Sequence, residues 1–167
     1  QIKLEFSIPA RGLIGFRSEF LTMTKGEGVM HHLFDGYEPW KGEIPGRRRG
    51  VLVAFETGET TAYAIHGFEE RGSFFIKPME KVYAGMIVGQ NARENDMVVN
   101  PCKKKALTNM RAAGADDLIQ LTPPRVFSLE QAMAYIEEDE LAEITPKNIR
   151  LRKKELDHSR RRKSEKE

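Results

Sequence analysis

The amino-acid sequence predicts an α+β fold, with a short strand–helix–strand unit followed by a strand-rich body that carries one or two helices. Apolar and polar residues alternate over residues 2–8, as in a strand with one buried face. Short apolar runs separated by turn residues fill residues 50–100. A Ser-Leu-Glu-Gln motif at residues 128–131 has the capping-box spacing that begins an α-helix. Together these three patterns favour the α+β class.

The N-terminal unit consists of a strand at residues 2–8, a turn at residues 9–12, a helix over residues 15–23 and a second strand at residues 29–34. Three apolar residues of the helix share one face. They are Phe16, Phe20 and Met23. A unit of this size cannot bury both of its faces, so we expect exposed apolar side chains or self-association with a second molecule. The residues concerned are Phe6, Ile8 and Phe20.

A Gly-rich linker over residues 41–50 precedes the body, whose short strands favour a small antiparallel sheet or a barrel-like arrangement. The turn at residues 57–59 suggests a hairpin with a returning strand, and residues 69–72 suggest another turn. The strands predicted here are at residues 51–55, 60–65, 74–76, 82–88 and 97–99.

The helix that begins after Ser128 has an apolar stripe at helical spacing. The stripe consists of Leu129, Ala132, Met133 and Ile136. An acidic run at residues 137–140 follows, where the helix dipole disfavours carboxylates. We expect these acids to be solvated or to pair with the basic tail. A last strand is predicted within residues 143–151, and the tail beyond Leu156 is predicted to be frayed helix or disordered.

Charge is distributed unevenly along the chain. The formal net charge is +2, but residues 147–167 hold ten Lys/Arg against four acids, so they carry +6 and the remainder carries −4. A mildly acidic body with local basic clusters suggests aimed contact with a polyanion. The single cysteine, Cys102, excludes an intrachain disulfide and fits a reducing cytosol. No apolar run approaches the ~18 residues of a membrane span, and no signal peptide is visible.

The densest basic cluster without acids lies in residues 99–117, beside Asn, Gly and Pro residues that favour an irregular backbone. It is either a solvated surface loop or a polyanion-binding segment. A second basic cluster, at residues 47–49, has two interpretations of equal weight. Its charges are either solvated as part of the linker or bind phosphate. Motifs of nucleotide, ester and metallopeptidase chemistry are absent, and His31 and His32, adjacent on a predicted strand, point to opposite faces. The residues alone therefore support a binding module, not an enzyme, with no metal site.

Several motifs resemble known translational GTPases. The segment R-G-L-I-G-F-R-S-E-F-L-T-M-T-K-G-E-G at residues 11–28 is similar to the fifth domain of elongation-factor-G-like proteins. Three further motifs resemble the BipA/TypA family specifically. They are N-P-C-K-K-K-A-L-T-N-M-R-A at residues 100–112, L-T-P-P at 121–124 and I-T-P-K-N-I-R-L-R-K at 144–153.

The resemblance implies three parts. Residues 1–46 would be the second half of a ferredoxin-like domain V, residues 47–152 the family's C-terminal domain, and residues 153–167 a basic, disordered tail. It also implies a cytoplasmic protein that associates with the ribosome in large-subunit assembly and in stress or cold adaptation. We expect the functional unit to continue N-terminal to Gln1, with GTP and magnesium bound by a GTPase domain there and no cofactor in this part.

The resemblance further implies that the basic loop reaches toward large-subunit rRNA or A-site tRNA, with lysines positioning the RNA without reading its bases. The alternative is a module that docks ribosomal or regulatory proteins. No membrane partner is expected. The candidate RNA-binding residues are Lys103, Lys104, Lys105, Thr108, Asn109, Arg111, Arg47, Arg48, Arg49, Arg150, Arg152, Lys153 and Lys154.

Overall fold

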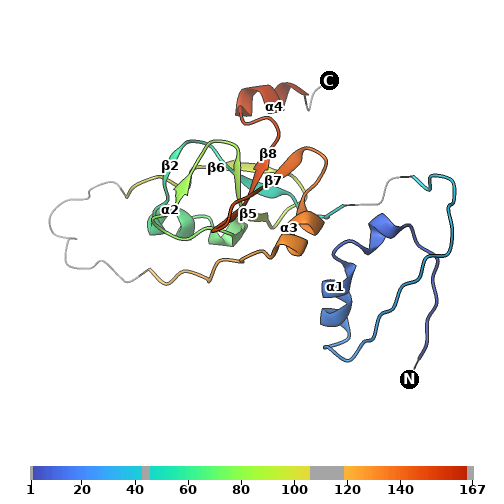
Figure 1. Ribbon diagram of the computed structural model, residues 1–167. Coiled ribbons are helices and arrows are strands. Elements are labelled where there is room, and N and C mark those ends of the chain that lie inside the picture. The colour runs from blue at the N-terminus through green and yellow to red at the C-terminus, as the bar shows by residue number, and fades with distance from the viewer. Residues whose placement is uncertain (1, 43–45, 106–118, 165–167) are drawn as a thin grey trace.

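The structure is a computed structural model that describes residues 2–42, 46–105 and 119–164. It confirms the α+β class: a six-stranded mixed sheet carries a few short helices (Figure 1). The strand order is β6-β1-β5-β8-β7, and β3 also pairs with β5. This sheet is open, so the barrel-like alternative is wrong for the described strands. Their bounds are β1 Val51–Ala54, β3 Gly72–Phe74, β5 Met86–Asn91, β6 Met97–Val99, β7 Glu140–Ile144 and β8 Ile149–Lys153.

Strand β1 is buried on both faces, which explains its uninterrupted apolar sequence. Leu52 and Ala54 pack in one core cluster, which includes Ile65 of the helix α2 (Ala62–His66). Val51 and Val53 pack in a second cluster on the other face, with residues of the helix α3 (Leu129–Tyr135). The central sheet is therefore covered by a short helix on each side.

The region predicted as a hairpin has a different structure. Gly58–Glu59 is not a turn but a short strand, β2, which pairs with β4 (Lys81–Val82). The returning strand predicted at residues 60–65 is wrong, because Thr61 caps α2 by accepting a hydrogen bond from the backbone N–H of Ala64 (3.1 Å). This cap, and the burial of the Ala64 and Ile65 side chains, favour the helix over the β-propensity of the segment.

Two other predicted elements are shifted. The strand predicted at residues 82–88 is divided between β4 and β5, because Gly85 adopts a left-handed conformation (φ 85°) between them. The turn predicted at residues 69–72 contains a 3-10 helix, η2 (Glu69–Arg71), followed by β3. At the start of β3, a Cβ on Gly72 would lie 2.0 Å from the Gln90 carbonyl oxygen, so only glycine permits this approach to β5.

The helix predicted in the N-terminal unit is confirmed as α1 (Phe16–Met23), which follows a 3-10 helix, η1 (Ala10–Leu13). The strands predicted at residues 2–8 and 29–34 are wrong, since neither segment pairs with a strand among the described residues. Without such hydrogen bonds an alternating pattern does not hold a strand. Phe6 is 82% and Ile8 49% exposed, as expected, whereas Phe20 is half-buried.

The C-terminal elements confirm the capping box of Ser128 at the start of α3. The apolar stripe was only partly correct, because Leu129 and Met133 are exposed whereas Ala132 and Tyr135 are buried. Instead of one last strand, β7 and β8 form an antiparallel hairpin. The helix α4 (His158–Ser164) agrees with the helical alternative for the tail beyond Leu156, whereas residue 153, which was assigned to the tail, is buried in β8. None of the described helices has the length and apolar character needed to cross a membrane.

Candidate nucleic-acid interface

The basic loop starts directly after β6, where the chain leaves the sheet. Pro101 is buried, and the side chain of Asn100 donates to Glu56 (Nδ2–Oε1 2.8 Å). The same side chain accepts from the backbone N–H of Cys102 (2.9 Å). The three lysines that follow are exposed: Lys103, Lys104 and Lys105. Three cations therefore lie at the surface immediately beyond a hydrogen-bonded stem. Three other candidates lie outside the described residues: Thr108, Asn109 and Arg111.

Cys102 lies within this stem. Burial, and to a lesser degree the charge of Glu56, raise the pKa of its thiol. A nucleophilic cysteine requires the opposite shift, toward the thiolate. Cys102 packs against the core cluster that contains Val99, and its surroundings disfavour the thiolate.

The arginine triplet separates into one buried and two exposed side chains. Arg47 binds Glu140 through both terminal nitrogens (Nη1–Oε2 2.6 Å, Nη2–Oε1 2.5 Å) and donates to the Tyr135 carbonyl (3.1 Å). Arg48 and Arg49 are exposed. Arg47 is thus engaged inside the protein, whereas its two neighbours face solvent.

The candidates on β8 also divide by environment. Arg150 and Arg152 are half-buried, and Arg152 Nε lies 2.8 Å from Glu143 Oε1. Lys153 is only 3% exposed, whereas Lys154 is exposed. Of these four candidates, Lys154 is the one in the exposed class.

The sequence did not predict that Arg47 and Lys153 belong to one network of ion pairs. The ammonium of Lys153 lies 2.6 Å from Asp139 Oδ2, 2.6 Å from Asp96 Oδ2 and 2.9 Å from Glu140 Oε1. Glu140 joins both cations, and its side chain is fully buried. We call these residues, Arg47, Asp96, Asp139, Glu140 and Lys153, the ionic cluster. It ties the linker before β1 to the β7–β8 hairpin.

Opposite charges decide the ionisation of this cluster. Burial opposes the charge of Arg47, but hydrogen bonding and charge from Glu140 outweigh it, and the pKa of Arg47 is raised. Burial likewise opposes the charge of Lys153, yet its three carboxylate partners raise the pKa of Lys153. Glu137, Asp139 and Glu140 each offer an oxygen within 4.8 Å of the others, but each of these carboxylates already pairs with Arg47 or Lys153.

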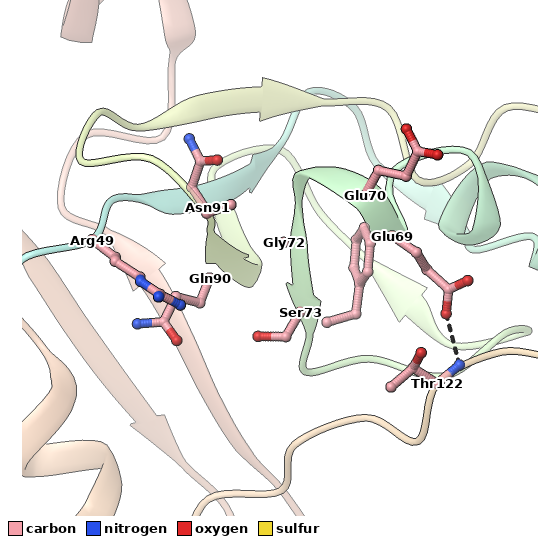
Figure 2. A pocket seen from close by; sticks show the side chains of 10 residues that line it. Arg49, Glu69, Glu70, Gly72, Ser73, Gln90, Asn91 and Thr122 are labelled. Carbon is pink, nitrogen blue, oxygen red and sulfur yellow. Dashed lines mark hydrogen bonds between the residues drawn. The ribbon is translucent and has the colours of Figure 1, made fainter.

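A shallow cleft of about 330 Å³ lies along β3 and the end of β5 (Figure 2). Its polar lining residues include Arg49, Ser73, Gln90 and Thr122, together with two acidic residues, Glu69 and Glu70. Guanidinium, amide and hydroxyl groups can bind phosphate oxygens, ribose hydroxyls and base edges. Thr122 lies near the end of the basic region, so this polar cleft adjoins its returning stem.

Comparison with known proteins identifies the family. Residues 49–158, more than half of the chain, match the TypA/BipA C-terminal domain. The chain belongs to the TypA/BipA family. Residues 1–48 match the elongation factor G C-terminus, so this is the C-terminal region of a TypA/BipA protein, with the elongation-factor-G-like domain first. The resemblance inferred from the motifs is confirmed.

Curated TypA/BipA relatives are similar along nearly all of the chain. A Bacillus subtilis protein named large ribosomal subunit assembly factor BipA is 48% identical over 167 residues, which are 99% of this chain and 27% of the relative. Proteins of the same name from Synechocystis (54% over 151 residues, 90% and 25%) and Haemophilus influenzae (48% over 165 residues, 98% and 27%) are also similar. The chain therefore spans about a quarter of the length of these relatives.

Proposed function

We propose that this chain is the RNA-binding C-terminal part of a ribosome-associated translational GTPase that acts in assembly of the large ribosomal subunit. The observation that carries the proposal is the presentation of three consecutive exposed lysines, residues 103–105, on a hydrogen-bonded stem. The printed name of the relatives, large ribosomal subunit assembly factor, supports the ribosome as the partner. Within this proposal, residues 1–46, 47–152 and 153–167 are the three functional parts.

The structure divides the candidate RNA-binding residues by availability. Arg47 and Lys153 contribute to the fold, because both pair with the buried carboxylate of Glu140. A cation that already has buried partners gains little from a phosphate, since it would have to leave carboxylates behind unpaired. The exposed candidates make the contact: Lys103, Lys104, Lys105, Arg48, Arg49 and Lys154.

The RNA contacted is chiefly large-subunit rRNA, with A-site tRNA as the alternative, and both present dense phosphate charge. Lysines neutralise phosphates and release counterions, so they supply affinity and position without sequence readout. The polar cleft beside Arg49 can hold a ribose or a base edge. We also propose that GTP and magnesium are bound elsewhere in the protein, and that the cytoplasmic protein acts in stress or cold adaptation.

The test is nuclease-controlled co-sedimentation of the chain with purified large subunits across a salt series. Changing Lys103, Lys104 and Lys105 together to Ala is expected to weaken binding. The slope of the logarithm of the binding constant against the logarithm of salt concentration should become shallower by roughly three. A matched control changes Lys25, Lys77 and Lys81, three exposed lysines elsewhere, to Ala. An unchanged salt slope in the first variant would contradict the role of the loop.

A second candidate function, protein docking, is favoured by one observation. Large apolar side chains are exposed in the first forty residues, as Leu33 (93%), Tyr37 (98%) and Trp40 (74%) illustrate. Such a surface suits a protein partner or a second copy of the chain. Binding that survives nuclease treatment and ignores salt would favour this function over RNA binding.

A further inference from the structure

The basic region has two described stems, and both contact one short segment of the protein. The outgoing stem leaves β6 and reaches Lys103, and the returning stem includes Leu121 and Thr122. Between these contacts lies the segment of residues 61–69, which contains α2 and begins η2. The two ends of this segment hold the two stems.

The outgoing stem is held by the N-cap residue of α2. The backbone N–H of Thr61 donates to the Pro101 carbonyl (3.0 Å), and its hydroxyl donates to the Lys103 carbonyl (2.6 Å). The same hydroxyl accepts from the backbone N–H of Ala64 (3.1 Å). The Thr61 hydroxyl thus donates a hydrogen bond to the stem and accepts one from the helix. It thereby joins the start of α2 to the backbone of Lys103.

The returning stem is held at the other end. Glu69 Oε1 accepts from the backbone N–H of Thr122 (2.6 Å; dashed line in Figure 2), and Glu69 Oε2 lies 3.0 Å from His66 Nδ1. The bond from Thr122, more than any other cause, lowers the pKa of Glu69, so the carboxylate is ionised at neutral pH. A charged acceptor makes this hydrogen bond stronger than a neutral pair.

The segment between these anchors is itself fixed to the core. Ala64 and Ile65 are buried, and Phe68 packs against the cluster that contains Leu52. Leu121, beside the second anchor, packs against the same cluster. Both described stems therefore contact a segment that is packed against the core of the sheet.

We infer that residues 61–69 form a brace that fixes both stems of the basic loop, and that Thr61 and Glu69 are positioning residues for its contact with RNA. The second statement rests on the proposed function. A loop that is pre-positioned loses less conformational entropy when it binds, so the brace raises affinity without touching the ligand. It also explains an acidic residue beside a polyanion site: Glu69 holds the stem although its charge repels phosphate.

This repulsion gives the inference a decisive test. Glu69→Ala removes a negative charge near the RNA, so electrostatics alone predicts tighter binding. The brace predicts the opposite, about tenfold weaker binding to large subunits with an unchanged salt slope, because all lysines remain. Glu69→Gln keeps an acceptor oxygen for Thr122 and is expected to bind at least as tightly as the unaltered chain.

Thr61 provides an independent test with matched controls. Thr61→Val is expected to weaken binding about tenfold, and Thr61→Ser, which retains the hydroxyl, to restore it. Thr145→Val is the control for a general loss of stability. The Thr145 hydroxyl likewise donates one hydrogen bond and accepts one, both with Asn148 (3.0 Å each), in the turn between β7 and β8. The Thr145→Val variant is expected to bind large subunits as tightly as the unaltered chain.

Amide hydrogen exchange separates the brace from the RNA-binding proposal. Exchange at Thr122 is expected to accelerate in Glu69→Ala and not in Glu69→Gln. Unchanged exchange at Thr122, or Glu69→Ala binding at least as tightly as the unaltered chain when the triple-lysine variant has lost binding, would overturn the brace. Accelerated exchange together with normal binding by the triple-lysine variant would support the brace and reject the loop as the RNA contact.

Discussion

Replacing Arg47 with Ala is expected to destabilise the protein far more than replacing its neighbour Arg48. The Arg47 side chain is 9% exposed, makes two hydrogen bonds to the fully buried Glu140 and lies over the Tyr135 ring, 4.8 Å from its centre. Truncation removes all of these contacts at once. It also leaves a buried carboxylate with one cation fewer, which is the more costly effect.

The size of the destabilisation depends on the ion pair that Glu140 keeps after Arg47 is removed. Removing one partner of a buried ion pair costs about 3–5 kcal/mol of the free energy of unfolding. Lys153 stays 2.9 Å from Glu140 and preserves one counter-charge, so the lower end of that range, about 3 kcal/mol, is expected. For a domain of this size that corresponds to a fall in the melting temperature of roughly 12 °C.

Urea denaturation followed by far-ultraviolet circular dichroism measures this difference. Arg48→Ala is the matched control, since Arg48 is exposed and its loss should change the free energy of unfolding by less than about 0.5 kcal/mol. If the two variants unfold at the same urea concentration with equal slopes, the ionic cluster contributes no stability and the reasoning is refuted.

Three further changes test other parts of the fold. Gly72→Ala should destabilise by about 3 kcal/mol in urea unfolding, because the new Cβ would meet the Gln90 carbonyl at 2.0 Å; a neutral effect would contradict the close strand approach. Ser128→Ala should cost about 1 kcal/mol through the lost capping box, measured in the same way, whereas no change would discount the cap. The pKa of Glu69 is lowered on folding, so its stabilisation is present above about pH 5 and is lost as the pH falls through that lowered pKa. The melting-temperature difference between the unaltered protein and Glu69→Gln should therefore vanish in acid, and a difference that persists there would reject this assignment.

Local sequence signals predicted the elements that depend on local chemistry. The capping box of Ser128, the helix over residues 16–23 and the apolar strands β1 and β6 lie where the sequence predicts them. The helix and the cap depend on side-chain periodicity and on hydrogen bonds between near neighbours, and the two strands are recognisable as short apolar runs. The family resemblance, carried by motifs along the chain, was confirmed as well.

Features that depend on distant partners could not be predicted in the same way. The alternating pattern at residues 2–8 satisfies the rule for a strand, but no described strand pairs with it. Arg47 and Lys153 were predicted to be RNA-binding candidates, because nothing in the sequence shows that Glu140 lies between them. The acidic run at residues 137–140 gave a partial signal: carboxylates at the C-terminal end of a helix suggested pairing with the basic tail, and Lys153 is such a partner.

The strand order determines when the strand-rich body can fold during its synthesis. Its central strand, β5, pairs with β1 from the start of the body and with β8 from its end, while β6 lies parallel to β1. Contacts between residues so far apart in sequence make folding slow, because the chain must close long loops before it gains the pairing. The sheet can be completed only after Lys153 has been synthesised. Strand β3 covers the Gly89–Asn91 end of the β5 edge, so the Met86–Ile87 end would stay unpaired from the synthesis of β5 until that of β8. An unpaired strand edge favours aggregation, so this stage of translation is one at which the nascent body is vulnerable to it.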